Sequence, residues 1–405
     1  MKAVRATLAQ PGPQVGRPLA KRSQAQRVAE LDLAVAESFM RAALDEAAKG
    51  LGRTHPNPVV GAVVVKGGRV VSRGFHQKAG APHAEVVALT AAGAKARGAD
   101  LYTTLEPCAH FGRTPPCSEA ILKAGIKRVF CASADPNPLV NGKGVARLRR
   151  QGVEVVTGVL RDEADRLNRP FFKHVRTGLP WVTLKAAVTV DGKLASATGD
   201  SKWVSGTASR ERVHGLRDRV DAILVGANTV RSDDPRLTTR LPQGEGKDPL
   251  RIVVDSRLSL SPTLKLFTQR SAAKTVVATL AAPGGRRAKA LTRAGAEVWQ
   301  VQGQGKGNGQ QVDLPALLKR LGQEGLTHVL VEGGAELFGS LVRTGLADEL
   351  WLFIAPKLLG GDARSWLGAL GIERMADAIP LRELRWEASG GDLLLRARFE
   401  QEAGR

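Results

Sequence analysis

The residues best suited to hold a metal ion lie close together in the first half of the chain. They are His83, Cys108 and Cys117, which include two of the three cysteines in the sequence. One histidine and two cysteines can fill three positions around a zinc ion and leave a fourth position for water. Zinc held in this way makes water a strong nucleophile near neutral pH. The three residues therefore predict one catalytic zinc ion (Zn2+) per chain.

A carboxylate and a proline extend this pattern. Glu85 follows His83 by two residues, and Pro107 stands directly before Cys108. This order is typical of zinc deaminases that act on nucleobases, in which the glutamate moves protons and does not bind the metal. Eight residues separate Cys108 from Cys117, whereas the general form of the pattern is P-C-x-x-C. We expect Glu85 to be the proton shuttle of a hydrolytic deaminase.

The segment before this pattern is expected to supply substrate contacts. Asn57 lies in a proline-rich loop before the apolar run 59–65, and His76 ends the strand-like run 70–75. A side-chain amide beside a deaminase site can read the edge of a pyrimidine. We therefore predict that Asn57 and His76 contact the substrate. The alternatives are an ordinary turn residue for Asn57 and a solvated strand end for His76.

The elements that position these residues alternate between strand and helix. Strand-like apolar runs and helical patterns follow one another through residue 158, and a helix is predicted over 160–176. This alternation predicts a three-layer α/β domain. A turn-rich stretch at 176–180 predicts a domain boundary, after which a second α/β pattern begins. The predicted organisation is a basic, disordered tail over 1–30, a zinc domain over 31–176 and a second domain over 181–405.

Two features of the second half are placed for chemistry. Gly333 and Gly334 stand between a strand that ends at Glu332 and a helical pattern, where backbone amides can approach a phosphate. The spacing is not G-x-G-x-x-G, so a standard Rossmann fingerprint is absent, and a glycine pair is also common in turns. The polar run 229–235 follows the strand-like run 221–226. Ligands of α/β sheets bind at such carboxyl ends of strands.

The composition limits the partners and the compartment. The 405-residue chain has a formal net charge of +21, but its basic residues are dispersed and aromatic residues make up only 4%. Stacking platforms for single-stranded nucleic acid are therefore scarce, and the charge suits phosphorylated small substrates. No apolar run is long enough to span a membrane, and the low cysteine content favours a reducing cytoplasm. We predict a cytoplasmic enzyme without nucleic-acid or membrane partners, and self-association into a homo-oligomer stays open.

Further motifs lie on both sides of the predicted domain boundary. In the first half they are RTHPN at 53–57, HAE at 83–85, LEPC at 105–108, GRTPPC at 112–117 and DPNP at 135–138. In the second half they are DGK at 191–193, GDSKW at 199–203, DDPRLT at 233–238, VEGG at 331–334 and APKLLG at 355–360. Over residues 31–405 this set closely resembles the bifunctional deaminase/reductase family of bacterial riboflavin biosynthesis. The long gap between the two cysteines is normal in that family.

The resemblance implies two successive reactions and two folds. The first reaction hydrolytically removes the 2-amino group of a diaminopyrimidine that carries a phosphoribosylamino side chain. The second reaction uses NADPH to reduce the ribosyl group to ribityl. The implied folds are a cytidine-deaminase-like domain followed by a dihydrofolate-reductase-like domain, both of the α/β class.

The resemblance also implies roles for individual residues of the second domain. Cofactor contacts are implied for Ala187, Trp203, Thr229, Asp233, Ser256, Gly334, Ala335, Glu336, Leu337, Phe338, Gly339 and Ser340. Substrate contacts are implied for Ser201, Arg217, Leu237, Arg240 and Glu332. The guanidinium groups of Arg217 and Arg240 suit the substrate phosphate. Arg113 of the first half is another phosphate candidate, its alternative being a solvated loop residue. Lys185 is a weaker candidate for polarising the sugar carbonyl or imine, its alternative being a solvated strand lysine.

Two other classes of function compete with the bifunctional enzyme. A nucleic-acid-binding deaminase would need a continuous basic groove with aromatic side chains, but the chain has one tyrosine and six scattered tryptophans. A structural zinc protein would need a fourth protein ligand. Only three ligands are evident, and Glu85 stands beside one of them. The bifunctional enzyme is therefore the favoured hypothesis.

Overall fold

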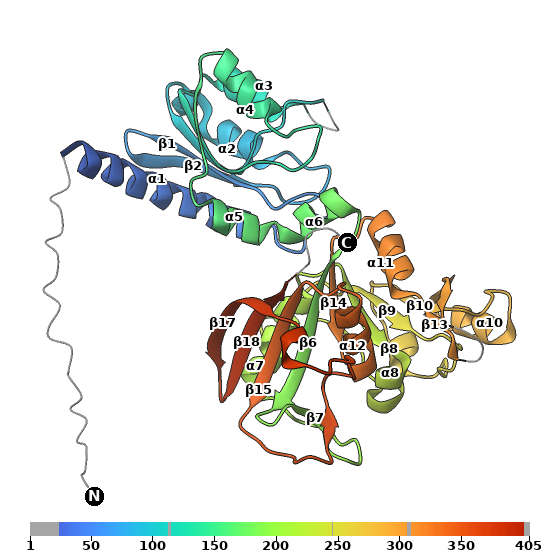
Figure 1. Ribbon diagram of the computed structural model, residues 1–405. Helices are drawn as coiled ribbons and strands as arrows, with labels where there is room; N and C mark the ends of the chain where they lie inside the picture. Colours follow the sequence, from blue (N-terminus) through green and yellow to red (C-terminus); the bar gives the residue numbers. More distant parts are fainter. Residues whose placement is uncertain (1–23, 112–114, 245, 306–308, 401–405) are drawn as a thin grey trace, which may run out of the picture.

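The chain forms two α/β bodies, each built around its own sheet. The computed structural model describes residues 24–111, 115–244, 246–305 and 309–400. Figure 1 shows the two bodies, which are joined where α6 (Arg169–Thr177) leads into β6 (Trp181–Thr189). None of the described helices is long and apolar enough to cross a membrane.

The first sheet has five strands in the order β2-β1-β3-β4-β5. The central strand β1 (Gly61–Lys66) pairs antiparallel with β2 (Arg69–Phe75) and with β3 (Asp100–Leu105). Strands β3, β4 (Arg128–Ser133) and β5 (Glu154–Thr157) are parallel to one another. Gly67 and Gly68, between β1 and β2, have φ angles of 57° and 73°, the left-handed values that a tight hairpin turn requires.

Helices cover both faces of this sheet, because successive strand residues point to opposite sides. Val63 and Val65 pack with α1 (Gln24–Ala48) and with α5 (Arg161–Leu167). Ala62 and Val64 pack on the other face with the helices α2 (Ala84–Ala92), α3 (Cys117–Ala124) and α4 (Lys143–Arg150). The short 3-10 helix 93–96 follows α2. The predicted three-layer arrangement is therefore present.

The second sheet has nine strands in the order β11-β10-β9-β8-β14-β6-β15-β18-β17. Neighbouring strands from β11 through β15 are parallel, and β18 and β17 complete the sheet with antiparallel pairs. The strands are β6, β8 (Ala222–Gly226), β9 (Leu250–Val254), β10 (Thr275–Thr279), β11 (Ala296–Gln300), β14 (His328–Glu332), β15 (Glu349–Ala355), β17 (Leu381–Ser389) and β18 (Asp392–Phe399). Two small pairs, β7 (Lys193–Ala195) with β16 (Arg364–Ser365) and β12 (Gly303–Gln304) with β13 (Gln311–Val312), lie outside it.

Helices also cover both faces of the second sheet. Apolar side chains of α11 (Leu314–Gln323) and α12 (Ala335–Arg343) pack on one face. On the other face pack α7 (Thr207–Arg217), α8 (Ala227–Asp233), α9 (Lys265–Thr268) and α10 (Arg286–Arg293). The parallel strands all end at one edge, so the segments that follow β6, β8, β9 and β14 meet there.

The structure differs from the predicted elements at several places. The predicted helix over 160–176 is two helices, because Asn168 between α5 and α6 uses its side chain to bond the backbone N–H and carbonyl of Val59. Residues 24–30 of the predicted disordered tail belong to α1, and residues 1–23 lie outside the described part of the chain. The exposed strand β17 was missed because it lacks a buried apolar face.

Candidate active sites

The three predicted zinc ligands converge on one point at the edge of the first sheet. His83 is the residue before α2, Cys108 follows β3, and Cys117 is the first residue of α3. Their ligand atoms all lie within 4.8 Å of one another. His83 Nδ1 is 3.1 Å from Cys117 Sγ and 3.6 Å from Cys108 Sγ. One nitrogen and two sulfur atoms at such separations fit a tetrahedral zinc ion with one position left for water.

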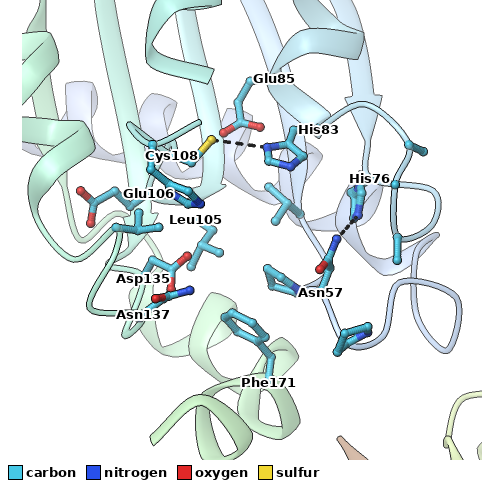
Figure 2. A pocket seen from close by; sticks show the side chains of 18 residues that line it. Asn57, His76, His83, Glu85, Leu105, Glu106, Cys108, Asp135, Asn137 and Phe171 are labelled. Carbon is cyan, nitrogen blue, oxygen red and sulfur yellow. Dashed lines mark hydrogen bonds between the residues drawn. The ribbon is translucent and has the colours of Figure 1, made fainter. Parts of the chain in front are cut away.

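Glu85 lies beside this group but is not part of it. It is in the first turn of α2, and only 3% of its surface is exposed. Burial raises the pKa of the Glu85 carboxyl to about 7, against the opposing effect of His83. A carboxyl with this pKa can both accept and release a proton near neutral pH. Figure 2 shows Glu85 next to His83 and Cys108.

Asn57 and His76 line the same cavity, which has a volume of about 410 Å³. The Asn57 amide nitrogen is 3.1 Å from His76 Nε2, and His76 Nδ1 is 3.1 Å from the Pro82 carbonyl oxygen. A carbonyl can only accept, so Nδ1 carries the proton and Nε2 accepts from Asn57. Burial lowers the pKa of His76, which keeps this imidazole neutral. The pair is therefore held in one orientation at the cavity wall (Figure 2).

Several cavity residues were not among the predicted contacts. His110, Asp135, Asn137 and Phe171 line the cavity, and Asp135 has its pKa raised to about 6, chiefly by burial. Residues 135–138 carry the DPNP motif, whereas Phe171 has no signal in the sequence because it reaches the cavity from α6. Glu106 also reaches the cavity, and its carboxylate accepts the backbone N–H groups of the first residues of α4. Arg113 lies outside the described residues.

A second polar group lies in the nine-stranded sheet, at the end of β14 and beside it in the middle of β6. Arg217 donates from Nε and Nη2 to the two Glu332 oxygens at 2.7 and 2.8 Å, and from Nη1 to the Thr238 carbonyl at 2.9 Å. Burial opposes ionisation, but Arg217 and its hydrogen bonds lower the pKa of Glu332 to about 2. Lys185 pairs with Glu332 across the two strands, and burial lowers the pKa of its ammonium group. A carboxylate, a guanidinium group and a buried amine thus meet at one place.

The glycine pair lies beside this group. Gly333 and Gly334 have φ angles of 87° and 95°, and α12 begins at the next residue. A Cβ on Gly333 would lie 3.0 Å from Thr229 Cγ2, and one on Gly334 would lie 3.5 Å from Thr229 Oγ1. The first backbone N–H groups of a helix have no partner inside it. The turn therefore presents backbone amides in a cradle that a larger side chain would fill.

The remaining residues that were predicted to contact cofactor or substrate lie in different surroundings, some buried and some exposed. Leu337 and Phe338 are buried in the core, so they can offer a ligand only backbone atoms. Ser256 Oγ accepts the Val312 N–H at 3.1 Å, and the exposed Trp203 ring lies 4.7 Å from the Arg210 guanidinium. The other predicted contacts lie in the same body. Ala187 is on β6, Ser201 is in the loop after β7, and Asp233 ends α8. Leu237 is buried, Arg240 lies beside His214, and the helix α12 carries Ala335, Glu336, Gly339 and Ser340.

Comparisons with known proteins give both halves of the chain a family. Residues 34–133 match the cytidine and deoxycytidylate deaminase zinc-binding region, and residues 180–395 match the RibD C-terminal domain. The riboflavin biosynthesis protein RibD of Bacillus amyloliquefaciens is 45% identical over 362 residues, which cover 89% of this chain and 95% of that protein. The chain belongs to the RibD family. RibD of Escherichia coli K12 is 41% identical over 359 residues, and the match covers 84% of this chain and 93% of that protein.

Solved structures of the family agree with this assignment. RibD of Acinetobacter baumannii superposes with a TM-score of 0.81 at 39% identity, covering 91% of this chain and all of that one. A Thermotoga maritima structure has a TM-score of 0.79 at 36% identity with the same coverage, and is named a diaminohydroxyphosphoribosylaminopyrimidine deaminase/5-amino-6-(5-phosphoribosylamino)uracil reductase. The predicted fold class is confirmed: a cytidine-deaminase-like domain precedes a dihydrofolate-reductase-like domain. This RibD-family chain is a bifunctional deaminase and reductase of riboflavin biosynthesis.

Proposed function

We propose that the chain deaminates 2,5-diamino-6-(phosphoribosylamino)pyrimidinone and then reduces the ribosyl side chain of the product with NADPH. The product is 5-amino-6-(5-phosphoribitylamino)uracil. The observation that carries this proposal is the buried Glu85 beside a histidine and two cysteines, in a cavity whose wall holds Asn57 and His76. The names of the Thermotoga maritima structure's two activities support the choice of substrates.

In the first reaction the chain must hold one metal ion and move protons. His83, Cys108 and Cys117 hold zinc, which supplies an activated water molecule when it is bound. Glu85 takes a proton from the attacking water at its carboxylate and returns it to the departing amino nitrogen. The water oxygen is bonded to the ring carbon as the carbon–nitrogen bond breaks, so ammonia leaves and a carbonyl remains. Asn57 and His76 orient the pyrimidine ring.

In the second reaction the chain must hold NADPH, which supplies a hydride. The backbone N–H groups of Gly334, Ala335, Glu336 and Leu337, at the start of α12, bind the cofactor phosphates. The Phe338 N–H already bonds the Gly334 carbonyl, so Phe338, Gly339 and Ser340 belong to the proposed site as the next turn of the same helix. Ala187, Trp203, Thr229, Asp233 and Ser256 complete the cofactor contacts. This assignment is supported by the glycine cradle, whose free amides and missing Cβ atoms suit a diphosphate.

The substrate contacts of the second reaction divide into two kinds. Arg217 already uses three N–H groups on Glu332 and Thr238, so we assign it to orienting Glu332 against the sugar. Arg240 is more exposed and suits the phosphate, with Ser201 and Leu237 along the remaining surface. Lys185 is placed to polarise the sugar carbonyl or imine and to give it a proton. We also infer a cytoplasmic enzyme, where the ligand thiols stay reduced.

Metal analysis tests the zinc assignment. The chain is expected to hold one zinc ion, and the double substitution Cys108→Ala with Cys117→Ala is expected to abolish zinc binding. The matched control is Cys131→Ala, because Cys131 is buried as Cys117 is, but bonds the Ser133 carbonyl and lies outside the ligand group. Full zinc stoichiometry in the double variant would refute the assignment.

Product analysis tests the proposed order of the two reactions. Without NADPH, the purified chain should convert the diaminopyrimidine to the uracil that still carries the ribosyl group, with release of ammonia. Addition of NADPH should then convert that uracil to the ribityl compound. Reduction of the diaminopyrimidine before any ammonia is released would contradict the proposed order.

A further inference from the structure

A set of contacts between the two domains links the loop beside the deaminase site to the reductase domain. We propose that the reductase domain holds the Asn57 loop of the deaminase site in position, and that Arg53 and His55 are the positioning residues. The inference rests on the proposed function, because it assigns a role to residues that act through Asn57. It predicts that a carboxylate in one domain affects substrate binding in the other.

Polar contacts fasten the loop to the reductase domain from one side. Arg53 Nη2 donates to both Asp218 carboxylate oxygens at 2.8 and 3.0 Å, and Arg53 Nη1 donates to the Asp218 backbone carbonyl at 2.8 Å. His55 Nδ1 lies 2.9 Å from Asp221 Oδ1. Lys247 Nζ donates to the Gly52 carbonyl at 2.9 Å. Three residues of the reductase domain therefore hold three of the four loop positions 52–55, namely Gly52, Arg53 and His55.

The backbones of the two domains also meet closely at Gly52. This glycine has a φ angle of 72°, and a Cβ on it would lie 2.5 Å from the Asp218 carbonyl oxygen and 2.7 Å from Arg219 Cα. Only a residue without a side chain permits that approach. The two backbones are therefore in close contact at Gly52, so the loop cannot move any nearer to the reductase domain.

The loop transmits this position to the deaminase cavity. Thr54 Oγ1 donates to the Asn57 carbonyl at 3.0 Å, and the Asn57 N–H donates to the Thr54 carbonyl at 2.9 Å. Thr54 is 3% exposed, so this closed turn is packed as well as bonded. Asn57 must therefore move with Arg53 and His55. At its other end Asn57 bonds His76, within the cavity that contains His83 and Glu85.

The anchoring carboxylates are fixed within the reductase domain. Asp221 Oδ2 accepts the Thr327 N–H and hydroxyl, each at 2.8 Å, and the His328 N–H at 3.0 Å. Asp218 Oδ1 accepts the Lys247 N–H at 2.7 Å. Asp218 also follows Arg217, the residue paired with Glu332 in the reductase site. Asp218 and Asp221 therefore belong to the same part of the reductase domain that positions the reductase site.

The test compares two carboxylate-to-amide variants at the domain interface. Asp218→Asn weakens the Arg53 contact, and Glu383→Gln weakens the ion pair that Arg169 of α6 makes with Glu383 of β17 at 2.6 Å. Asp218→Asn is expected to raise the KM of deamination about twofold to fivefold, the effect of losing a partly exposed ion pair. The kcat should stay near its original value, and Glu383→Gln should leave both constants unchanged.

Further variants separate positioning from a general loss of stability. Arg53→Ala should also raise the deamination KM, and its combination with Asp218→Asn should raise it no further, because both remove one contact. Arg53→Lys keeps the charge but not the two-pronged geometry, so its KM should fall between those of Arg53→Ala and the parent. If thermal denaturation shows that Asp218→Asn is unfolded, the deamination KM values of Arg53→Ala and Arg53→Lys, compared with that of the parent, test the inference instead.

The outcomes are distinguishable from those that test the proposed function. Ammonia release by the parent chain is measured first, and if the parent releases none, the proposed function is wrong and the inference falls with it. An active parent whose KM is unchanged by Asp218→Asn and Arg53→Ala overturns the inference alone. An equal rise in the deamination KM of Glu383→Gln also overturns the inference, because any weakening of the domain interface would then have the same effect.

Discussion

Glu85→Gln is expected to reduce ammonia release by about a hundredfold to ten-thousandfold, the range typical of a lost general acid–base group. Glutamine has the shape of glutamate but cannot take a proton from water and return it to the leaving nitrogen. The position favours this role because Glu85 is buried and its pKa lies at about 7. Zinc content should stay at one ion per chain, because the ligands His83, Cys108 and Cys117 are untouched. Steady-state assays of ammonia release check the prediction.

A matched control for this variant is Glu119→Gln. Glu119 is in the first turn of α3, as Glu85 is in the first turn of α2, but it pairs with Arg147 and does not line the cavity. It should deaminate at the parental rate. Both variants should reduce the deaminated intermediate normally, since distant sites act independently unless they share contacts. Near-parental ammonia release by Glu85→Gln would rule out the proton-shuttle role.

Gly334→Val is expected to raise the apparent KM for NADPH about tenfold or more, a cost of about 1.4 kcal/mol or more in binding. Gly334 has a φ angle of 95°, which a β-branched residue adopts only with strain. The added side chain would also stand at the start of α12, where the cofactor diphosphate is proposed to bind. Deamination should persist, because the zinc site lies in the other domain. Titration of NADPH against the purified variant gives the direct measurement.

Gly345→Val is the control at the other end of the same helix. Gly345 follows α12, has a φ angle of 66°, and a Cβ on it would meet no atom within 4 Å. This variant carries similar backbone strain without entering the proposed cofactor site, so its stability should fall while its KM for NADPH stays unchanged. An unchanged KM in Gly334→Val would mean that the glycine pair is ordinary turn chemistry. An equal rise in the KM for NADPH in Gly334→Val and Gly345→Val would mean that backbone strain causes the effect.

The zinc site could be predicted because its residues are encoded in short segments. His83 and Glu85 lie on one helix start, and Cys108 and Cys117 lie at a strand end and the next helix start. Such segments converge in an α/β sheet whatever the details of packing. Buried strands could also be predicted: the strand-like run 221–226 matches β8 within one residue.

Features that depend on distant partners could not be predicted. The ion pair between Arg217 and Glu332 joins residues far apart in the sequence, so no sequence pattern indicates their mutual contact. The break at Asn168 depends on the backbone of Val59, and the place of Phe171 in the cavity depends on how α6 packs. The contacts of Arg53 with Asp218 cross between the domains. Patterns of period two or 3.6 carry no information about such pairs.

One assay tests directly whether a single chain carries out both reactions in the proposed order. The diaminopyrimidine substrate and NADPH are mixed with the purified chain, and ammonia release and NADPH oxidation are followed together. The account predicts equal final amounts of ammonia and oxidised NADPH, with ammonia appearing first. It also predicts that Glu85→Gln oxidises NADPH only when the deaminated intermediate is supplied. Oxidation of NADPH by Glu85→Gln on the diaminopyrimidine itself, at the parental rate, would contradict the account.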